Sequence, residues 1–319
     1  MIKGLSITPP VIGRIAIGKV VEKNGKRLPE KDDAFTITTQ VQQKDGWLLH
    51  PLHQKLVAES PSGKIRTIPI TVLFNDPSLN LRAQYSLFER KSGRLLCVGN
   101  GENAKRSTPE GLKTVVCLSP EGCGLGKELG CKPYGRLNVQ IEGQDDDLGT
   151  FMFRTTGYNS IRTLAARLQY YHALSHGKTR FLPLSLKLRA KSTTQSHRAP
   201  VYYVDLVLRE GLSLEEALPK ALEMAKLAEM AGIDYVALEE SARQGLSNGA
   251  FEESEEERPE VLAEFFPEVV SETASEMTES EEAVVGETEG KSGLNATTIM
   301  PAVPLESGKL EPVPTRRVR

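Results

Sequence analysis

Four cysteines are the residues in this chain whose type and spacing first suggest chemistry. They fall close together within 319 residues, at Cys97, Cys117, Cys123 and Cys131. Zinc binds thiolates tetrahedrally, and a site of four thiolates leaves no open position for a reacting molecule. Glycines stand beside the thiols, and glycine permits the tight turns that aim backbone N–H groups at sulfur. The cluster therefore predicts a structural Zn²⁺ site, with these four cysteines as its ligands.

The spacing of the cysteines leaves an alternative open. The intervening lengths are 19, 5 and 7 residues, whereas common zinc fingers pair their ligands two to four residues apart. Four thiols that are buried or unconnected, and bind no metal, are the alternative. A disulfide scaffold is not expected, because four cysteines are too few for a secreted protein of this length.

Charge is distributed unevenly along the chain, although the formal net charge is only −2. Residues 251–290 contain fifteen acids and one base, whereas residues 1–250 carry a net charge of +9. A segment so rich in Glu, Ser, Thr and Pro buries too little apolar surface to offset its ordering entropy. We therefore expect a disordered acidic tail over residues 250–319. The apolar run Val261–Phe266 interrupts it, either as a docking motif or as a chance cluster.

A basic segment without a single acid runs from Leu148 to Val204, over 57 residues. Period-two alternation in a strand over residues 181–191 would place three cations on one face and four leucines on the other. Such a row suits a phosphate backbone, an acidic protein surface or this protein's own tail, and a solvated basic face is the alternative. The residues expected at a partner or nucleic-acid interface are Lys187, Arg189, Lys191, Arg180 and Arg198.

The elements that must position these residues read as strands first and helices later. Alternating apolar positions predict short strands over most of residues 13–157, with a turn at Asp32-Asp33 and a hairpin at Lys91–Gly93. The further elements that we expect are strands at 134–141, 150–156, 181–191 and 201–208, and helices at 160–175, 213–232 and 234–244. A capping box at Ser213–Glu216 opens the second of these helices.

The expected fold class is therefore α+β. It consists of a mixed antiparallel sheet domain with a zinc-bound loop region, helices towards the C-terminal part and a disordered acidic tail. The expected regions are a mostly β part at 1–96, the cysteine cluster at 97–133, an α+β part with the basic face at 134–249, and the tail at 250–319. No stretch approaches the ~20 apolar residues that span a bilayer, and the N-terminus lacks a signal peptide's apolar run. We expect a cytoplasmic protein.

Segments around the thiols resemble those of a known family. Cys97-Val-Gly-Asn-Gly101 and Cys131-Lys-Pro-Tyr-Gly-Arg-Leu-Asn-Val139 look like the metal-site segment of phage recombination directionality factors that act with large serine integrases. The segments similar to the sheet, helix and sheet that follow in that family are 149–157, Ser160-Ile161, 181–189 and 200–206. The resemblance covers about residues 97–209. It implies zinc ligands at the four cysteines and a protein without catalysis that binds its integrase and switches recombination towards excision.

Two functions from different classes follow. The first is a recombination accessory factor of a prophage or other mobile element, which binds a serine integrase or another recombination protein, with DNA as a further candidate partner and no membrane partner. The alternative is a single-stranded DNA binding or annealing protein of a mobile element with a regulatory acidic tail. An enzyme is not expected, because the sequence shows no convincing constellation of carboxylates and histidines, and the adjacent Asp145, Asp146 and Asp147 are typical of a solvated turn.

Overall fold

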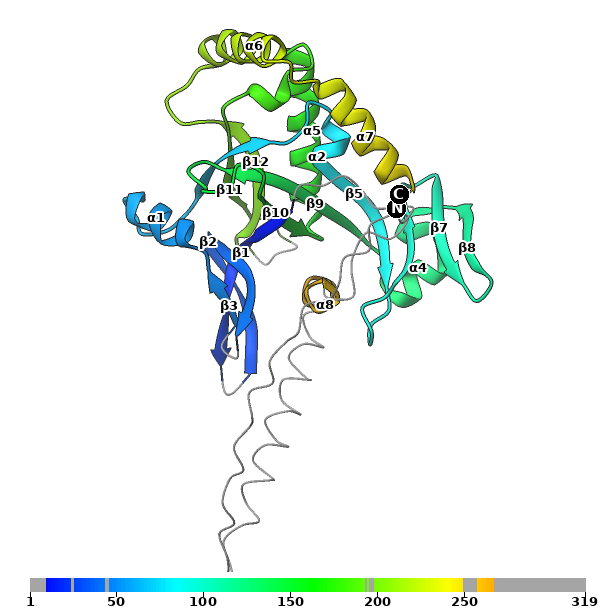
Figure 1. Cartoon of the computed structure of the whole chain (residues 1–319). Coiled ribbons are helices and arrows are strands. Elements are labelled where there is room, and N and C mark those ends of the chain that lie inside the picture. The colour runs from blue at the N-terminus through cyan, green and yellow to red at the C-terminus, as the bar shows by residue number, and fades with distance from the viewer. Residues whose placement is uncertain are drawn as a thin grey trace, which may run out of the picture. The chain divides into compact units, whose positions relative to one another are not determined.

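A mixed β-sheet organises the fold (Figure 1), as the alternating apolar positions of the N-terminal half predict. The computed structural model describes residues 10–23, 26–43, 46–192, 194, 198–248 and 257–266, all within one compact unit that spans Met1–Met277. The strands are β1 (Val11–Lys23), β2 (Lys26–Gln43), β3 (Gly46–Leu49), β4 (Thr67–Val72), β5 (Leu81–Phe88), β6 (Leu95–Gly99), β7 (Asn103–Thr108), β8 (Gly111–Val116), β9 (Lys132–Ile141), β10 (Thr150–Thr155), β11 (Leu184–Lys191) and β12 (Val201–Leu208).

Helices interrupt and follow these strands, and the long ones lie in the C-terminal half. They are α1 (Pro51–Glu59), α2 (Pro77–Asn80), α3 (Ser119–Gly122), α4 (Gly124–Leu129), α5 (Tyr158–Leu174), the 3-10 turn η1 (Thr179–Phe181), α6 (Leu214–Met230), α7 (Tyr235–Asn248) and α8 (Arg258–Phe265). The predicted α+β class, with a mixed sheet and late helices, is therefore confirmed. Among the residues that the structure describes, no helix is both long enough and apolar enough to cross a membrane.

The order of the strands places the cysteines at one end of the sheet. Neighbouring strands follow the order β3-β2-β1-β10-β9-β5-β6-β7-β8. Strand β4 also pairs with β9, β11 pairs with β4, and β12 pairs with β11. The pair β1–β10 is parallel, whereas the other described strand pairs are antiparallel. Figure 1 shows β7, β8 and α4 gathered beyond β5, away from β3.

The main core lies on one face of this sheet. Strand β4 alternates half-buried and buried residues, and Ile68, Ile70 and Val72 are completely buried. Helix α5 covers part of the core with Leu164 and Leu168, both at 0% exposure. Because side chains alternate across a strand, the opposite face carries many of the polar and charged residues, together with a separate apolar cluster that includes Phe88 and Tyr134.

Several expected elements are confirmed, because local turn and capping chemistry determines them. Strands β5 and β6 form the antiparallel hairpin around Lys91–Gly93, and β9 pairs with β10. The capping box is present: the Ser213 hydroxyl accepts from the Glu216 backbone N–H, and the Glu216 carboxylate accepts from Ser213 N–H at 2.9 Å.

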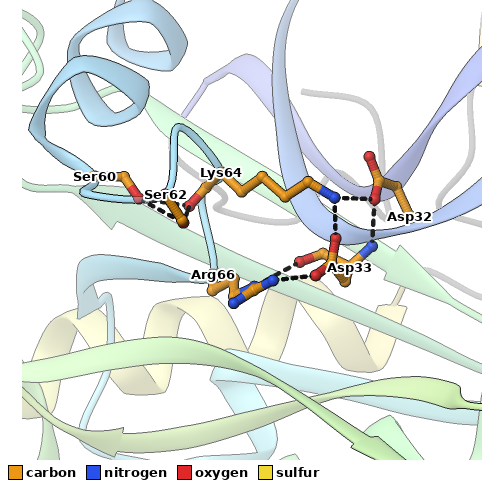
Figure 2. Close-up of polar contacts among 6 residues, drawn as sticks. All are labelled: Asp32, Asp33, Ser60, Ser62, Lys64 and Arg66. Atoms are coloured by element: carbon orange, nitrogen blue, oxygen red, sulfur yellow. Dashed lines mark hydrogen bonds and ion pairs between the residues drawn. The ribbon is translucent and has the colours of Figure 1, made fainter.

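The turn expected at Asp32-Asp33 was wrong. Strand β2 runs through both residues, and the register with β1 shifts opposite Gly18, where four residues of β2 face one of β1. The two carboxylates are held by cations from the segment before β4 (Figure 2): Lys64 Nζ contacts Asp32 Oδ1 at 2.9 Å and also Asp33, and Arg66 contacts Asp33. Hydrogen bonds from Lys64 and Arg66 hold the pKa of Asp33 well below its ordinary value.

The acidic tail differs from the expected disorder over one segment. Residues 258–265 form helix α8, and its side chains Val261 and Phe265 are completely buried. These residues belong to the apolar run that the sequence singled out, and the run docks on the protein's own body. The remainder of the expected disordered tail, at 250–256 and 267–319, lies outside the described residues.

Candidate functional site

The four cysteines are supplied by a small lobe at the end of the sheet. Cys97 lies on β6, Cys117 directly follows β8, Cys123 separates α3 from α4, and Cys131 directly precedes β9. All four are half-buried free thiols. Three turns and one strand therefore contribute the sulfurs, which explains the irregular spacing along the chain.

Glycines allow the close approach between these segments. A Cβ on Gly99 would lie 2.8 Å from Cys117 Sγ, a distance that real Cβ atoms do not reach. A Cβ on Gly126 would lie 3.2 Å from Cys131 Cβ and 3.3 Å from Cys123 Cβ. Packing thus excludes a side chain at Gly99 and leaves little room for one at Gly126.

The sulfurs are close enough to affect one another's charge. Burial and the charges of the other three cysteines raise the pKa of Cys131 to about 12. A hydrogen bond to Cys97 raises the pKa of Arg106, whose Nη2 also lies 3.8 Å from Cys123 Sγ. The Gly126 N–H donates to Cys123 Sγ at 3.4 Å. A guanidinium and a backbone N–H thus already face sulfur, and both stabilise thiolate over thiol.

The four thiols do not meet as a ready ligand set. Within the described residues, no group of three or more His, Cys, Asp or Glu side chains is arranged as ligands of a metal ion. The donor chemistry nevertheless fits Zn²⁺, because four soft sulfurs in one lobe are the set that zinc prefers in structural sites.

The predicted basic row on β11 has the expected orientation. Lys187, Arg189 and Lys191 are exposed, whereas Leu184 and Leu186 on the same strand are fully buried in the core. Period-two alternation therefore separated cations from leucines correctly. Lys191 Nζ lies 2.6 Å from Asn159 Oδ1 at the start of α5.

The middle residue of this row has a structural partner. Asp205 of β12 is only 2% exposed, and its carboxylate accepts from Arg189 Nε at 2.6 Å and from Arg167 Nε at 3.0 Å. The Leu206 N–H donates to the same carboxylate at 2.9 Å. Part of the charge of Arg189 is therefore neutralised, and Lys187 and Lys191 carry the exposed charge of the row.

The other two predicted interface residues lie elsewhere. The half-buried Arg180 donates to the Leu73 carbonyl and stacks over the Tyr235 ring, with 5.1 Å to its centroid. Its guanidinium is engaged in the fold, so Arg180 does not extend the exposed row. Arg198 is exposed in the loop between β11 and β12, and its backbone is left-handed, with φ at 62°.

Sequence reasoning missed a second basic surface, which we call the arginine row: Arg14, Arg154, Arg136 and Arg82. These residues lie on four adjacent strands, β1, β10, β9 and β5. Arg154 is directly opposite Arg136, which is directly opposite Arg82, and Arg14 is opposite Met152, two residues before Arg154. Alternation alone could have put Arg136 and Arg154 on the polar face. Only the register shows that four positive charges line up.

Comparison with known proteins adds one match. A family model described as Gp3-like, recombination directionality factor-like, matches residues 12–209. The matched range contains the sheet, the cysteine lobe and the basic row of β11, and it ends one residue after β12. No curated protein and no solved structure matches the chain.

Proposed function

Because the chain belongs to the family of Gp3-like, recombination directionality factor-like proteins, we propose that it is a recombination accessory factor that binds a serine integrase of a prophage or other mobile element and biases it towards excision. The observation that carries this proposal is the family match, which covers most of the described sheet. The match itself supports a role in recombination, and the type of integrase and the direction of the reaction are the proposed part.

Binding alone is sufficient for such a switch. A protein that prefers one conformation of an integrase–DNA complex shifts the outcome by its differential affinity for that conformation. We propose that the exposed cations Lys187, Lys191 and Arg198 contribute to the contact, since β11 presents the two lysines on the side opposite its buried leucines. Exposed cations accelerate encounter with an acidic surface.

We further propose that the four cysteines hold a structural Zn²⁺. The lobe has little apolar core of its own: Leu112, Val116 and Leu118 are 55%, 70% and 59% exposed. A lobe with so few buried side chains needs a cross-link, and thiolate coordination couples metal binding to folding. Arg106 contacts Cys97 and Cys123. Burial and the charges of the other cysteines raise the pKa of Cys131, and a divalent cation among the four sulfurs would relieve that repulsion between thiolates.

Excision reconstituted from purified components tests the proposed function. A serine integrase from the same mobile element is incubated with substrate DNA carrying the two attachment sites of the integrated state. We expect the integrase alone to excise poorly and the addition of this protein to raise the excised fraction. The protein should also bind the integrase in the absence of DNA. An unchanged product ratio, together with no binding, would refute the proposal.

A second candidate function has one observation in its favour. Tyr158 and Tyr170 of α5 are 59% and 53% exposed, and exposed aromatic rings beside cations can stack on unpaired bases. The alternative is a single-stranded DNA binding or annealing protein. It replaces the first proposal if the protein saturates single-stranded DNA at physiological salt and leaves integrase products unchanged.

A further inference from the structure

Helix α8 occupies a site on the polar face of the sheet that combines an aromatic pocket with positive charge. Phe265 inserts between Phe88 and Tyr134, with ring centroids 4.7 and 5.2 Å away. All three rings are at most 1% exposed. Val261 and Phe266 complete the same apolar cluster. The site is thus shaped around aromatic side chains that come from the tail.

Charged contacts surround this pocket. Glu260 pairs with Arg154 at 2.6 Å and also with Arg14, and Glu257 pairs with Arg154. The side chains of Arg14, Arg154 and Glu260 are only 13%, 10% and 10% exposed. Like charges on adjacent strands repel one another, and the acids of α8 relieve this repulsion at two positions of the arginine row.

Backbone contacts fix the ends of the segment. The Glu264 carboxylate accepts from Thr156 N–H at 2.6 Å and from its hydroxyl at 3.0 Å. Lys132 Nζ donates to the Phe265 carbonyl, one of the C-terminal carbonyls that a helix leaves unpaired. Gly93 admits the first turn, because a Cβ there would lie 2.9 Å from Arg258 Cβ. The body therefore recognises the segment along its whole length.

An eight-residue helix is too short to be stable alone in water. Its contacts follow one helical face, at positions 257, 260, 261, 264 and 265. This pattern of anchors is that of an amphipathic peptide in a groove. The segment thus behaves as a peptide ligand that is connected to its own receptor by the chain.

We propose that this groove is a binding site for short acidic amphipathic helices with an aromatic anchor, that α8 is its built-in occupant, and that a partner helix of the same chemistry displaces α8. A tethered occupant acts at an effective concentration near the millimolar range, so it screens the groove from weak ligands. The groove is built from residues of β1, β5, β9 and β10 and not from the β11 row, and the inference does not depend on the identity of the recombinase.

A helical peptide suits the groove better than a phosphate backbone. Phosphates would satisfy Arg14 and Arg154, but they would leave the pocket between Phe88 and Tyr134 without its aromatic anchor. Unfilled apolar surface costs free energy in proportion to its area. Nucleic acid is therefore the competing ligand, and the test distinguishes it from the peptide.

The test uses the full-length chain and a fluorescent peptide of residues 255–268, followed by anisotropy. The variant Phe265→Ala weakens the built-in occupant and leaves the groove intact. We expect this variant to bind the peptide at least about tenfold more tightly than the wild-type chain does, because the competing segment is weakened. Adding Gly93→Ala should abolish the gain, since its Cβ obstructs the groove. Gly63→Ala is the matched control: its φ of +64° is close to the +66° of Gly93, yet nothing lies within 4 Å.

The single tryptophan provides a second readout. The Arg14 guanidinium lies 3.6 Å from the centroid of the Trp47 ring and pairs with Glu260. Release of α8 should therefore change the Trp47 emission, and peptide binding should restore it. The variant Glu260→Lys opens the groove without leaving a cavity, and it replaces Phe265→Ala if that variant loses its cooperative thermal transition.

Two results would overturn the inference. If the opened variants and the wild-type chain bind the peptide equally, α8 is an ordinary part of the fold and not a displaceable occupant. If the opened variants gain affinity for a 20-base-pair duplex but not for the peptide, the groove is a nucleic-acid surface instead.

Discussion

Gly99 lies against Cys117 so closely that a Cβ at position 99 would come 2.8 Å from the Cys117 sulfur. The strand that carries Cys97 thus contacts a second thiol through a residue without a side chain. The same added Cβ would lie 2.7 Å from Ala104 Cβ on the neighbouring strand, so neither side has room to give. A substitution at Gly99 therefore tests whether zinc binding depends on the positions of the sulfurs.

The proposed zinc site predicts that Gly99→Ala lowers both the zinc content and the thermal stability. The displaced sulfur would no longer complete a four-thiolate shell, and overpacking of this kind costs about 1–3 kcal/mol. Elemental analysis should find about one zinc per wild-type chain and clearly less in the variant. Gly124→Ala is the control, because a Cβ there meets nothing within 4 Å. Wild-type protein without zinc, and with four freely titratable thiols, would contradict the site.

The two exposed lysines of β11 predict an effect on integrase binding. The double variant Lys187→Glu/Lys191→Glu should bind integrase at least about tenfold more weakly, because it reverses the sign of the proposed contact surface. Arg189 is left unchanged, since its Nε pairs with the buried Asp205 carboxylate at 2.6 Å. Lys187 is opposite Asp205 in the β11–β12 register, so the Tm of the double variant is measured as well. The binding is measured by biolayer interferometry at two salt concentrations.

A matched charge reversal controls for net charge. Lys220 and Lys226 lie exposed on α6, and the double variant Lys220→Glu/Lys226→Glu changes the total charge by the same amount. It should bind integrase as the wild-type protein does. Equal losses in both double variants would show that net charge matters and the β11 surface does not.

Asp205 predicts a stability effect that involves no partner. Asp205→Ala leaves two guanidiniums without their acceptor, and because each side chain is 41% exposed, water compensates part of the loss. We expect the free energy of unfolding to fall by about 1–2 kcal/mol, a decrease in Tm of about 2–8 °C. Differential scanning calorimetry measures the shift, and Asp147→Ala in an exposed turn should leave the Tm unchanged. A Tm unchanged by Asp205→Ala would show that the contacts of Asp205 with Arg167 and Arg189 contribute no stability.

The cluster of Figure 2 predicts how stability depends on acid. The hydrogen bond from Lys64 lowers the pKa of Asp33, and that from Arg66 lowers it further. A carboxyl whose pKa is lower in the folded state stabilises the fold above its ordinary pKa of 3.8, and this contribution is lost as the pH falls below that value. The Tm should therefore drop less between pH 7 and pH 3 in Asp33→Asn than in the wild-type protein. The same drop in both would exclude this contribution.

Sequence patterns predicted the elements that local chemistry determines. Glycine at the end of the Lys91–Gly93 turn and the capping box at Ser213 act within a few residues, and both elements appear where they were expected. The cysteine lobe shows the opposite case. Strands β7 and β8 could not be placed individually, because Asn103–Thr108 is almost entirely polar and Gly111–Val116 is mostly exposed, so apolar residues do not alternate along them.

A candidate basic surface could be predicted from sequence only where all of its residues lie on a single strand. Lys187, Arg189 and Lys191 follow from period two, whereas the arginine row depends on the register of four strands. Helix α8 could not be placed from sequence, because Glu260 is 106 positions from its partner Arg154 along the chain. Local patterns carry no information about partners at that separation.

The parallel pairing of β1 with β10 has a consequence for synthesis on the ribosome. Val11 of β1 pairs with Thr150, and the Thr150 N–H donates to the Pro10 carbonyl at 2.8 Å. At about 5–20 residues per second, the first strand waits about 7–30 seconds for this neighbour to be made. Its other edge pairs early with β2, so a nascent hairpin exposes one unsatisfied edge throughout that time, and an unsatisfied edge invites pairing with other chains. The yield of folded protein should therefore fall as nascent chains become more crowded. It should rise when initiation is reduced, so that fewer ribosomes occupy each message at the same elongation rate.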